Sequence, residues 1–268
     1  MSFKRIFAIS LRFGYLLKHN KVRLVNIFAW AFFDIVIWGI TTLYLDGISK
    51  ASFSIFAVLM GGAILWLFLV RVQQSFILPM LEDVWSRNFM NLFASPLSIG
   101  EYIAGLILTG FITTIAAFSF ILITAYLFFS YNILQLGFLL IPFLFILFIF
   151  GLALGAFTMS LILRFGALAE WIAWILPFVL SPLSSVYYPV SALPQWAQYL
   201  AKILPTSYVF EGMRSSLMDG IFSVESLIIG FIIALIYLAA AYWLVIYNYR
   251  LAIRNGLIAR ITAETSQL

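Results

Sequence analysis

Six apolar runs, each close to the length needed to cross a lipid bilayer, constrain the fold of this chain more than any other feature. A helix needs about 20 mostly apolar residues to cross the hydrocarbon core. Within lipid, every backbone polar group must be paired inside the protein, which long apolar runs achieve as α-helices. We therefore expect an all-α polytopic membrane protein with six transmembrane helices. The runs cover residues 25–45, 53–70, 103–129, 134–163, 168–186 and 227–247.

The composition supports lipid as the solvent of this chain. Of its 268 residues, 65% are hydrophobic and 9% are charged, whereas a soluble domain has about 45–50% apolar and about 25% charged residues. The absence of cysteine and the single histidine, His19, leave no thiolate or multi-histidine metal site. Basic residues flank the apolar runs, so they indicate orientation in a membrane, and we expect no nucleic-acid partner.

The distribution of basic residues predicts the orientation. Six crossings place both termini on one side, and of the 15 Lys and Arg residues only Lys50, Lys202 and Arg214 then fall on the other side. Cytoplasmic connections carry the excess of Lys and Arg, so both termini are predicted to be cytoplasmic. The residues assigned to this side are Lys4, Arg5, Arg12, Lys18, Lys21, Arg23, Arg71, Arg87, Arg164, Arg250, Arg254 and Arg260.

A segment on the opposite, external side, residues 187–223, is too short and too broken by proline to cross again. Pro189, Pro194 and Pro205 each remove a backbone donor and restrict the preceding residue. Glu211 and Arg214 stand three residues apart, which places them on one helix face. We predict a re-entrant helical hairpin that dips into the outer leaflet. Its first helix has an apolar stripe of Leu193, Trp196, Tyr199, Leu200, Ile203 and Leu204.

Two cytoplasmic segments flank the spans at the chain ends. In residues 1–24, apolar positions such as Phe3 and Phe7 interleave with basic ones, as in an amphipathic helix lying in the interface. An ordinary basic flank that sets topology explains the same pattern. At the other end, residues 248–268 are predicted to form a cytoplasmic tail.

The longest cytoplasmic connection, residues 80–97, is predicted to be a short helix that starts near Glu82 and ends at Ser95-Pro96. Ser98 and Glu101 form a capping box that starts the third span. Two interpretations are open: a helix that covers the bilayer surface, or a coupling helix that docks on a cytoplasmic motor subunit. Its apolar stripe consists of Trp85, Phe89, Leu92 and Phe93.

Asp34 lies inside the first apolar run, where a carboxylate is costly and faces the protein interior or water. It could line a translocation path or bind a proton, or it could be a packing residue at a helix or dimer interface. Glu170, near the inner end of the fifth run, could pair with Arg164 or belong to an inner gate. No cluster of His, Cys or carboxylates completes a catalytic site, so we do not expect an enzyme.

Three features make the chain resemble the type-2 ATP-binding-cassette export permeases of bacteria. One is the cytoplasmic Arg87-Asn88-Phe89 stretch followed by the turn at residues 95–98 and Glu101. Another is the external sequence YPVSALPQW…LPTSYVFEGMR, from Tyr188 to Arg214. The last is the set of six spans after an amphipathic N-terminal segment. The resemblance covers nearly the whole chain, which it implies is one transmembrane permease domain, residues 1–268.

The resemblance implies a half-transporter in the bacterial cytoplasmic membrane, surrounded by lipid, that pairs with a second permease copy, identical or related, and with cytoplasmic ATPase subunits. The chain has no G-x-x-x-x-G-K-[ST] loop, so it would bind no cofactor itself, and ATP and Mg would lie on the partner. The residues implied for ATPase coupling are Trp85, Arg87, Asn88 and Phe89. Those implied for the external hairpin or gate are Trp196, Pro205, Tyr208, Glu211 and Arg214. Asp34 is implied in the translocation path or the dimer interface.

The function expected from these features is that of the permease subunit of an ATP-driven exporter. An apolar and aromatic seam between two copies suits an amphipathic cargo, such as a drug-like molecule, a lipid or a lipid-linked glycan. The alternative is a gradient-driven secondary transporter that uses Asp34 and Glu170, although no inverted repeat supports it. A membrane scaffold is a further hypothesis, but it leaves the external hairpin unexplained.

Overall fold

The computed structural model describes residues 1–19, 21–48, 55–86, 88–218, 220 and 223–255, and every regular element among them is helical. The α-helices are α1 (Phe3–His19), α2 (Lys21–Ile48), α3 (Ile55–Trp85), α4 (Phe89–Ala94), α5 (Ile99–Phe129), α6 (Leu140–Phe165), α7 (Glu170–Leu180), α8 (Gln195–Ile203), α9 (Pro205–Met218) and α10 (Val224–Arg254). Short 3₁₀ turns cover Ile133–Leu139, Gly166–Ala169, Pro182–Ser184 and Val190–Ala192.

Five helices of the described chain are long and apolar enough to cross a membrane, which confirms an all-α polytopic architecture. They correspond to the first four predicted runs and to the last one. The candidate spans are Phe28–Ile48, Ile55–Trp85, Ile99–Phe129, Ile133–Phe165 and Val224–Arg254.

The second predicted span was much too short, because α3 continues for 15 residues past Val70 to Trp85. Beyond Arg71 the helix remains apolar and buried at positions such as Phe76, Met80 and Val84. Arg71 itself is buried and paired, so it does not end the helix. Arg71 therefore lies midway along α3, and its assignment to a connection between helices was wrong.

The fifth predicted span is not one long helix. Gly166 has a φ of 75° and ends α6, α7 has 11 residues, and Ser185 has a φ of 56° beyond the 3₁₀ turn. At one end of this segment, Trp85 Nε1 donates to Glu170 Oε2 over 2.9 Å. At the other end, a Cβ added to Gly62 would lie 2.6 Å from the Val186 carbonyl oxygen. Because Trp85 and Gly62 are about 34 Å apart along α3 at about 1.5 Å per residue, the segment follows α3 over most of its length.

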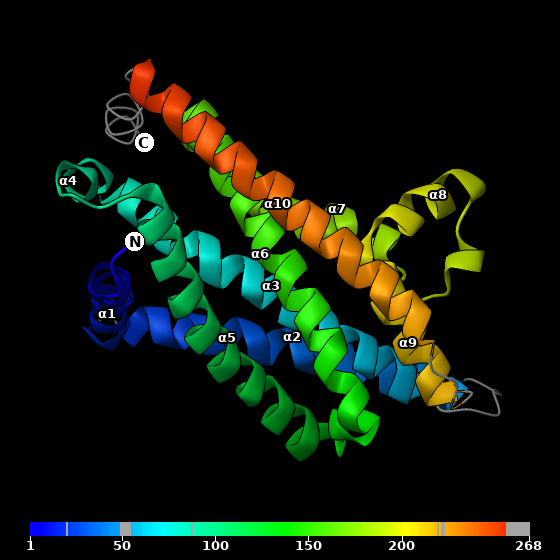
Figure 1. Cartoon of the computed structure of the whole chain (residues 1–268). Helices are drawn as coiled ribbons and strands as arrows, with labels where there is room; N and C mark the ends of the chain where they lie inside the picture. Colours follow the sequence, from blue (N-terminus) through cyan, green and yellow to red (C-terminus); the bar gives the residue numbers. More distant parts are fainter. Residues whose placement is uncertain (20, 49–54, 87, 219, 221–222, 256–268) are drawn as a thin grey trace.

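The core is built around α3, which packs against α5 and α6, while α10 lies along the other side of α6 (Figure 1). Small residues allow the close approach of α6 to α3. A Cβ added to Gly151 would lie 2.8 Å from Val72 Cβ, and one added to Gly155 would lie 2.8 Å from a Phe76 ring atom. The G-x-x-x-G pattern at these positions therefore serves close packing within the chain.

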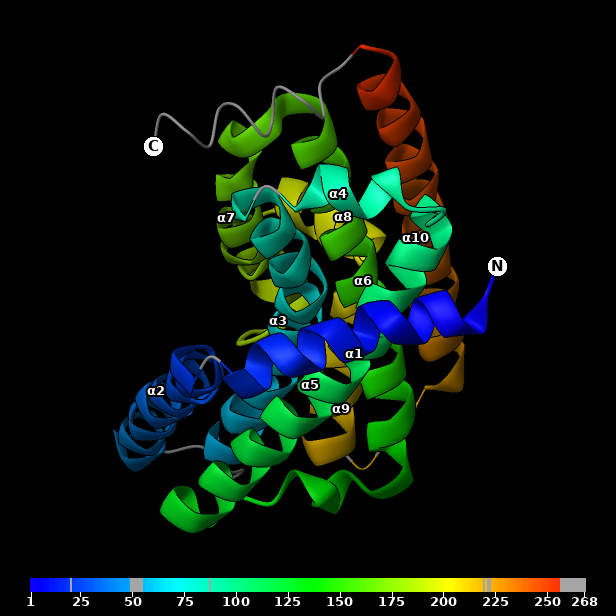
Figure 2. The same ribbon diagram turned by 90° about the vertical axis from the view of Figure 1, so that its left-hand side faces the viewer.

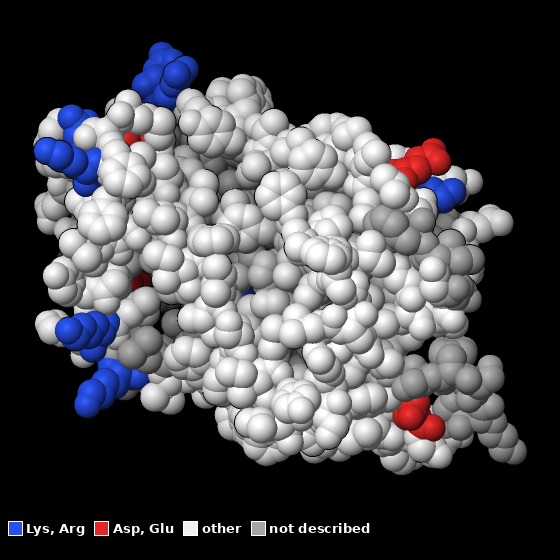
Figure 3. All heavy atoms as spheres, turned by 60° about the horizontal axis from the view of Figure 1, so that its bottom comes forward, with Lys and Arg blue, Asp and Glu red and all other residues white. Residues whose placement is uncertain are grey.

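The two ends of the bundle differ in the elements that they carry. Figure 1 shows α1, α4 and the C-terminal end of α10 at one end, and α8 and α9 at the other. Seen from the first end, α1 lies across the other helices (Figure 2). Lys and Arg side chains gather at this end, and the broad middle of the visible face is almost free of charge (Figure 3).

The predicted cytoplasmic tail is helical where it is described. α10 continues to Arg254, and Asn248 in its last turns is buried and donates through Nδ2 to Ser160 Oγ over 3.3 Å. Residues 256–268, which include Arg260, lie outside the described residues, as does Lys50.

Adding a methyl group at the α3–α6 contact should destabilise the fold. Gly151→Ala brings a Cβ within 2.8 Å of the β-branched Val72 and 3.1 Å of the Leu69 carbonyl oxygen. Overpacking of this kind costs about 1–3 kcal/mol, which a thermal melt in detergent would register as a lower Tm. The matched control is Gly14→Ala, where no atom lies within 4 Å and the better helix former should leave the Tm unchanged or higher. Equal melting temperatures for both variants would contradict the packing.

Candidate functional site

Glu211 and Arg214 of α9 form an ion pair, as their spacing predicted, and this pair clamps the hairpin formed by α8 and α9. Arg214 Nη1 lies 2.9 Å from Glu211 Oε1, and the same oxygen accepts from the Val190 backbone amide over 2.8 Å. Arg214 Nη2 donates to the Ser185 carbonyl oxygen over 2.8 Å. The pair on α9 therefore holds Ser185 and Val190, two points within the connection that leads from α7 to α8.

The turn between α8 and α9 lies below the outer end of the bundle. A Cβ added to Gly230 of α10 would lie 3.0 Å from Tyr208 Cβ and 3.4 Å from the Pro205 carbonyl oxygen. Gly230 is about 9 Å along α10 from its first residue. Pro205 is buried at the start of α9, and Tyr208 hydroxyl donates to the Lys202 carbonyl oxygen over 2.8 Å.

The face that α8 turns toward the protein is made of small residues. Ala197 and Ala201 are buried, whereas Trp196, Tyr199 and Ile203 of the predicted stripe are exposed. Leu204, after the helix, is the buried member of that stripe. The large apolar side chains of α8 therefore face outward, toward whatever surrounds the protomer.

The end of the bundle that carries α1 and α4 holds a network of charged groups. It joins α1 to the last turns of α3 and to the first turn of α5. Arg12 of α1 forms an ion pair with Asp83 of α3, and Asp83 Oδ2 accepts from the buried Tyr102 hydroxyl over 2.8 Å. Glu101 accepts from the Ser2 backbone amide over 2.6 Å and pairs with Arg5 over 3.2 Å. The predicted capping box of Ser98 and Glu101 is present at the start of α5. These contacts fix α1 against the bundle.

The structure divides the predicted helix at 80–97 into two parts. Glu82, Asp83 and Trp85 belong to the last turns of α3, so the expectation of a new helix starting at Glu82 was wrong. A break follows, and α4 comprises the six residues Phe89–Ala94. Tertiary packing explains the difference, because Phe76, Met80 and Val84 are buried against the rest of the protein and keep this part of the chain in α3.

The predicted coupling residues do not share one face. Trp85 is 45% exposed and bonds to Glu170, whereas Phe89 is 3% exposed and stacks edge-on against Tyr102. Asn88 is half-buried and precedes α4, and Arg87 lies outside the described residues. Among the α4 side chains that the structure describes, Asn91 and Ala94 are exposed, and neither belongs to the predicted apolar stripe.

Asp34 meets a partner that the sequence did not reveal. Arg71 Nη2 of α3 lies 3.3 Å from Asp34 Oδ2 of α2, and Arg71 Nη1 donates to Gln74 Oε1 over 3.0 Å. Nearby on α3, Gln73 Nε2 donates to the Ala173 carbonyl oxygen of α7 over 2.9 Å. Gln73, Gln74 and Ser75 follow Arg71 closely, so the local sequence did not indicate that the helix continues or that Arg71 meets Asp34.

A comparison with protein families agrees with this arrangement. The profile of the ABC-2 type transporter family matches residues 15–218, which include helices α2 to α9. The chain belongs to the ABC-2 type transporter family. No curated protein matched the chain. The chain is thus the membrane permease component of an ATP-binding-cassette transporter, and such components work with cytoplasmic ATP-binding subunits, often as dimers.

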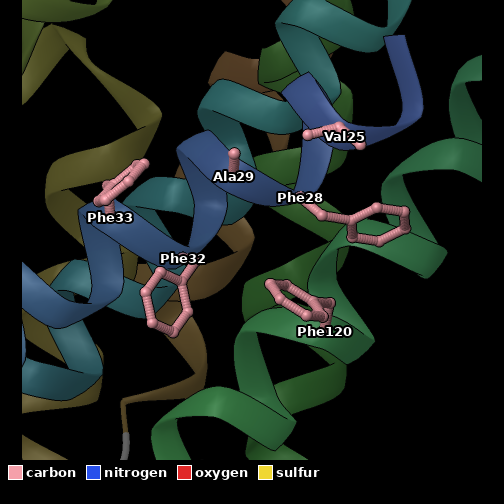
Figure 4. Close-up of a pocket in the computed structure, with 6 residues that line it drawn as sticks. All are labelled: Val25, Phe28, Ala29, Phe32, Phe33 and Phe120. Atoms are coloured by element: carbon pink, nitrogen blue, oxygen red, sulfur yellow. The ribbon is translucent and has the colours of Figure 1, made fainter. Parts of the chain in front are cut away.

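The permease also has an apolar groove between α2 and α5, with a volume of about 380 Å³ (Figure 4). Phe120 of α5 faces Phe28 of α2, with their ring centroids 5.1 Å apart. The other lining residues, Val25, Ala29, Phe32 and Phe33, are also apolar. Among the described residues no group of three His, Asp or Glu side chains is placed to bind a metal ion.

Removing the arginine of the clamp should loosen the hairpin formed by α8 and α9. Arg214→Ala leaves the buried Ser185 carbonyl oxygen without its donor and Glu211 without its cation. Charge-assisted hydrogen bonds are worth about 1.5–3 kcal/mol, so we expect faster amide hydrogen exchange in residues 185–215 of the permease. The control is Glu225→Gln, an exposed carboxylate in the first turn of α10. Unchanged exchange in Arg214→Ala would show that the clamp does not hold the hairpin.

Proposed function

We propose that this permease is the membrane subunit of an ATP-driven exporter and that it passes motion from a cytoplasmic ATPase to its external hairpin. The observation that carries the proposal is the continuous contact path along α3 and α7. Trp85, four residues before α4, is bonded to Glu170 at the start of α7, and α7 leads to Ser185, which the clamp holds. Helices joined in this way move as rigid bodies, so a displacement of α4 would reach the hairpin.

The same proposal includes six crossings with both termini in the cytoplasm of a bacterial cell. α7 with its flanking turns would be the fifth crossing, and its contacts with both ends of α3 support this. The gathering of Lys and Arg at the end that carries α1 and α4 supports the cytoplasmic assignment of that end. α1, amphipathic and lying across the bundle, would rest in the interface.

α4 is the proposed docking element for the ATPase subunit, which would bind ATP and Mg. It is a short helix held between two membrane-spanning helices, and Phe89 and Phe93 anchor it to Tyr102. Asn91 and Ala94 would then face the ATPase. A second permease copy, identical or related, would complete the path. The surface that α2 offers to this copy includes the exposed apolar positions Trp30, Ile37 and Ile40.

The cargo that suits this path is amphipathic, such as a drug-like molecule, a lipid or a lipid-linked glycan. The exposed surfaces of α2 and α7 are apolar and aromatic, with few charged groups among them. The gradient-driven alternative needs a carboxylate free to exchange protons, whereas Asp34 is held by Arg71 at 3.3 Å. Together with the family, this favours ATP-driven transport over the alternative.

Labelling of single cysteines tests the proposed topology directly, because the natural chain has no cysteine. Five proposed crossings, the last of them α7, separate Lys4 from Gln195. We expect a membrane-impermeant maleimide to label Gln195→Cys in intact cells and Lys4→Cys only after permeabilisation. If α7 did not cross, both positions would be labelled under the same conditions, and the six-span proposal would be wrong.

Co-purification tests the proposed function. The tagged permease, extracted from its native host in mild detergent, should retain an ATP-binding subunit and hydrolyse ATP. Ala94→Glu places a carboxylate in the proposed contact, and burying an unpaired charge costs enough to reduce retention about tenfold or more. Its Tm should stay unchanged, because Ala94 is exposed.

The matched control is Ala192→Glu, which adds the same charge to an exposed alanine beside the external hairpin and should retain the ATPase. Phe89→Ala is a different case, because it should lower the Tm through lost core packing of about 3–5 kcal/mol. Full retention of the ATPase by Ala94→Glu would remove α4 as the docking element. A stable permease that retains no ATP-binding subunit would contradict ATP-driven export.

A further inference from the structure

Asp34 is the accessible member of the charged pair that joins α2 to α3. Its side chain is 38% exposed, whereas that of Arg71 is 8% exposed. One guanidinium nitrogen of Arg71 is engaged by Asp34 and another by Gln74. Its Nε is buried and makes no hydrogen bond. A molecule that reaches this point from the surface of α2 therefore meets the carboxylate first.

Aromatic rings lie beside the carboxylate. Trp38 follows Asp34 by one helical turn on the same face of α2, and its ring stacks on Tyr187 with centroids 4.1 Å apart and an angle of 16°. The Tyr187 ring carries no charge at physiological pH, since an ordinary phenol ionises only at about pH 10. The faces of neutral aromatic rings attract cations.

The surface of α2 around this point is apolar. Phe33 and Ile37, which flank Asp34 along the helix, are largely exposed. A carboxylate in such surroundings is poorly solvated, so an opposite charge brought to it gains more energy than it would in water. The combination of one accessible negative charge, adjacent aromatic rings and surrounding apolar surface matches a particular kind of ligand.

We propose that Asp34, with Trp38 and Tyr187 beside it, binds the cationic group of an amphipathic cargo, an inference that rests on the export function proposed above. The carboxylate contacts the positive charge, the rings contribute cation–π attraction, and the apolar positions on α2 receive the hydrophobic part. Arg71 is a positioning residue that holds the carboxylate in place. An anionic head group is disfavoured, because it would have to displace Asp34 to reach the buried guanidinium.

The test compares two hydrophobic ions of similar size and shape and opposite charge, tetraphenylphosphonium and tetraphenylborate. Equilibrium dialysis measures the binding of each radiolabelled ion to the full-length permease, purified in detergent with the subunits that it retains. Both ions also enter micelles, so each variant is compared with the wild type at one detergent concentration. We expect saturable binding of the phosphonium to the wild type, weakened about tenfold or more by Asp34→Asn, and no saturable binding of the borate.

Three further variants make the result specific. Asp34→Glu keeps the charge and should keep phosphonium binding, as should Glu225→Gln, which removes an exposed carboxylate elsewhere. If Asp34→Asn does not fold because Arg71 is left unpaired, the double variant Asp34→Asn/Arg71→Gln leaves no charge at the site and should also lose phosphonium binding. Folding of each variant is checked by its Tm and by size-exclusion chromatography.

The proposal is overturned if folded Asp34→Asn or the double variant binds the phosphonium as the wild type does, or if the wild type prefers the borate. A failure of the export function would look different. In that case no ATP-binding subunit is retained, while phosphonium binding still depends on Asp34. Conversely, a permease that retains its ATPase but binds the phosphonium independently of Asp34 would keep the export function and lose this site.

Discussion

The central helix α3 carries polar and charged side chains that lipid cannot solvate, and the other helices are arranged so that these groups are paired. Asp83 near one end meets Arg12 of α1 and Tyr102 of α5, and Arg71 in the middle meets Asp34 of α2. Gln73 bonds to the backbone of α7. A buried ion without its partner costs about 3–5 kcal/mol, so these few contacts determine which helices can lie next to α3. Apolar packing alone would allow many other arrangements, because one apolar helix face resembles another.

Two further contacts are the discrete points through which motion could pass between the two ends of the permease. Packed helices do not deform continuously, so a displacement travels by rigid shifts at a few specific contacts. The Trp85–Glu170 bond joins α3 to α7, and the Glu211–Arg214 clamp joins the end of α7 to the hairpin. α2, in contrast, is bound to α3 by the Asp34–Arg71 pair within a mostly apolar surface. A ligand at Asp34 would therefore act on the contact that orients α2.

Local sequence rules predicted those features whose causes lie within a few residues of each other. The long apolar runs, the capping box of Ser98 and Glu101, and the meeting of Glu211 with Arg214 all follow from neighbours in the chain. The length of α3 could not be predicted in this way. Arg71 looked like the end of a span because a charge in lipid is costly, and that cost disappears only through Asp34, 37 residues earlier in the chain. The outward apolar face of α8 was likewise hidden, because Ala197 and Ala201, not the larger residues, fit against the protein.

The sequence by itself determined that lipid surrounds the chain, that its fold is helical and which family it belongs to. It also determined where prolines interrupt helices and where helix caps lie. These properties depend on composition and on short-range backbone chemistry. The tertiary structure decided which charges are paired, where α3 ends, which residues of α4 face outward and how α7 joins the two ends of the bundle. Those properties depend on side chains that are distant in the chain and meet only after the helices pack. For that reason Asp34 alone indicated a costly charge, whereas Asp34 with Arg71, Trp38 and Tyr187 indicates a site.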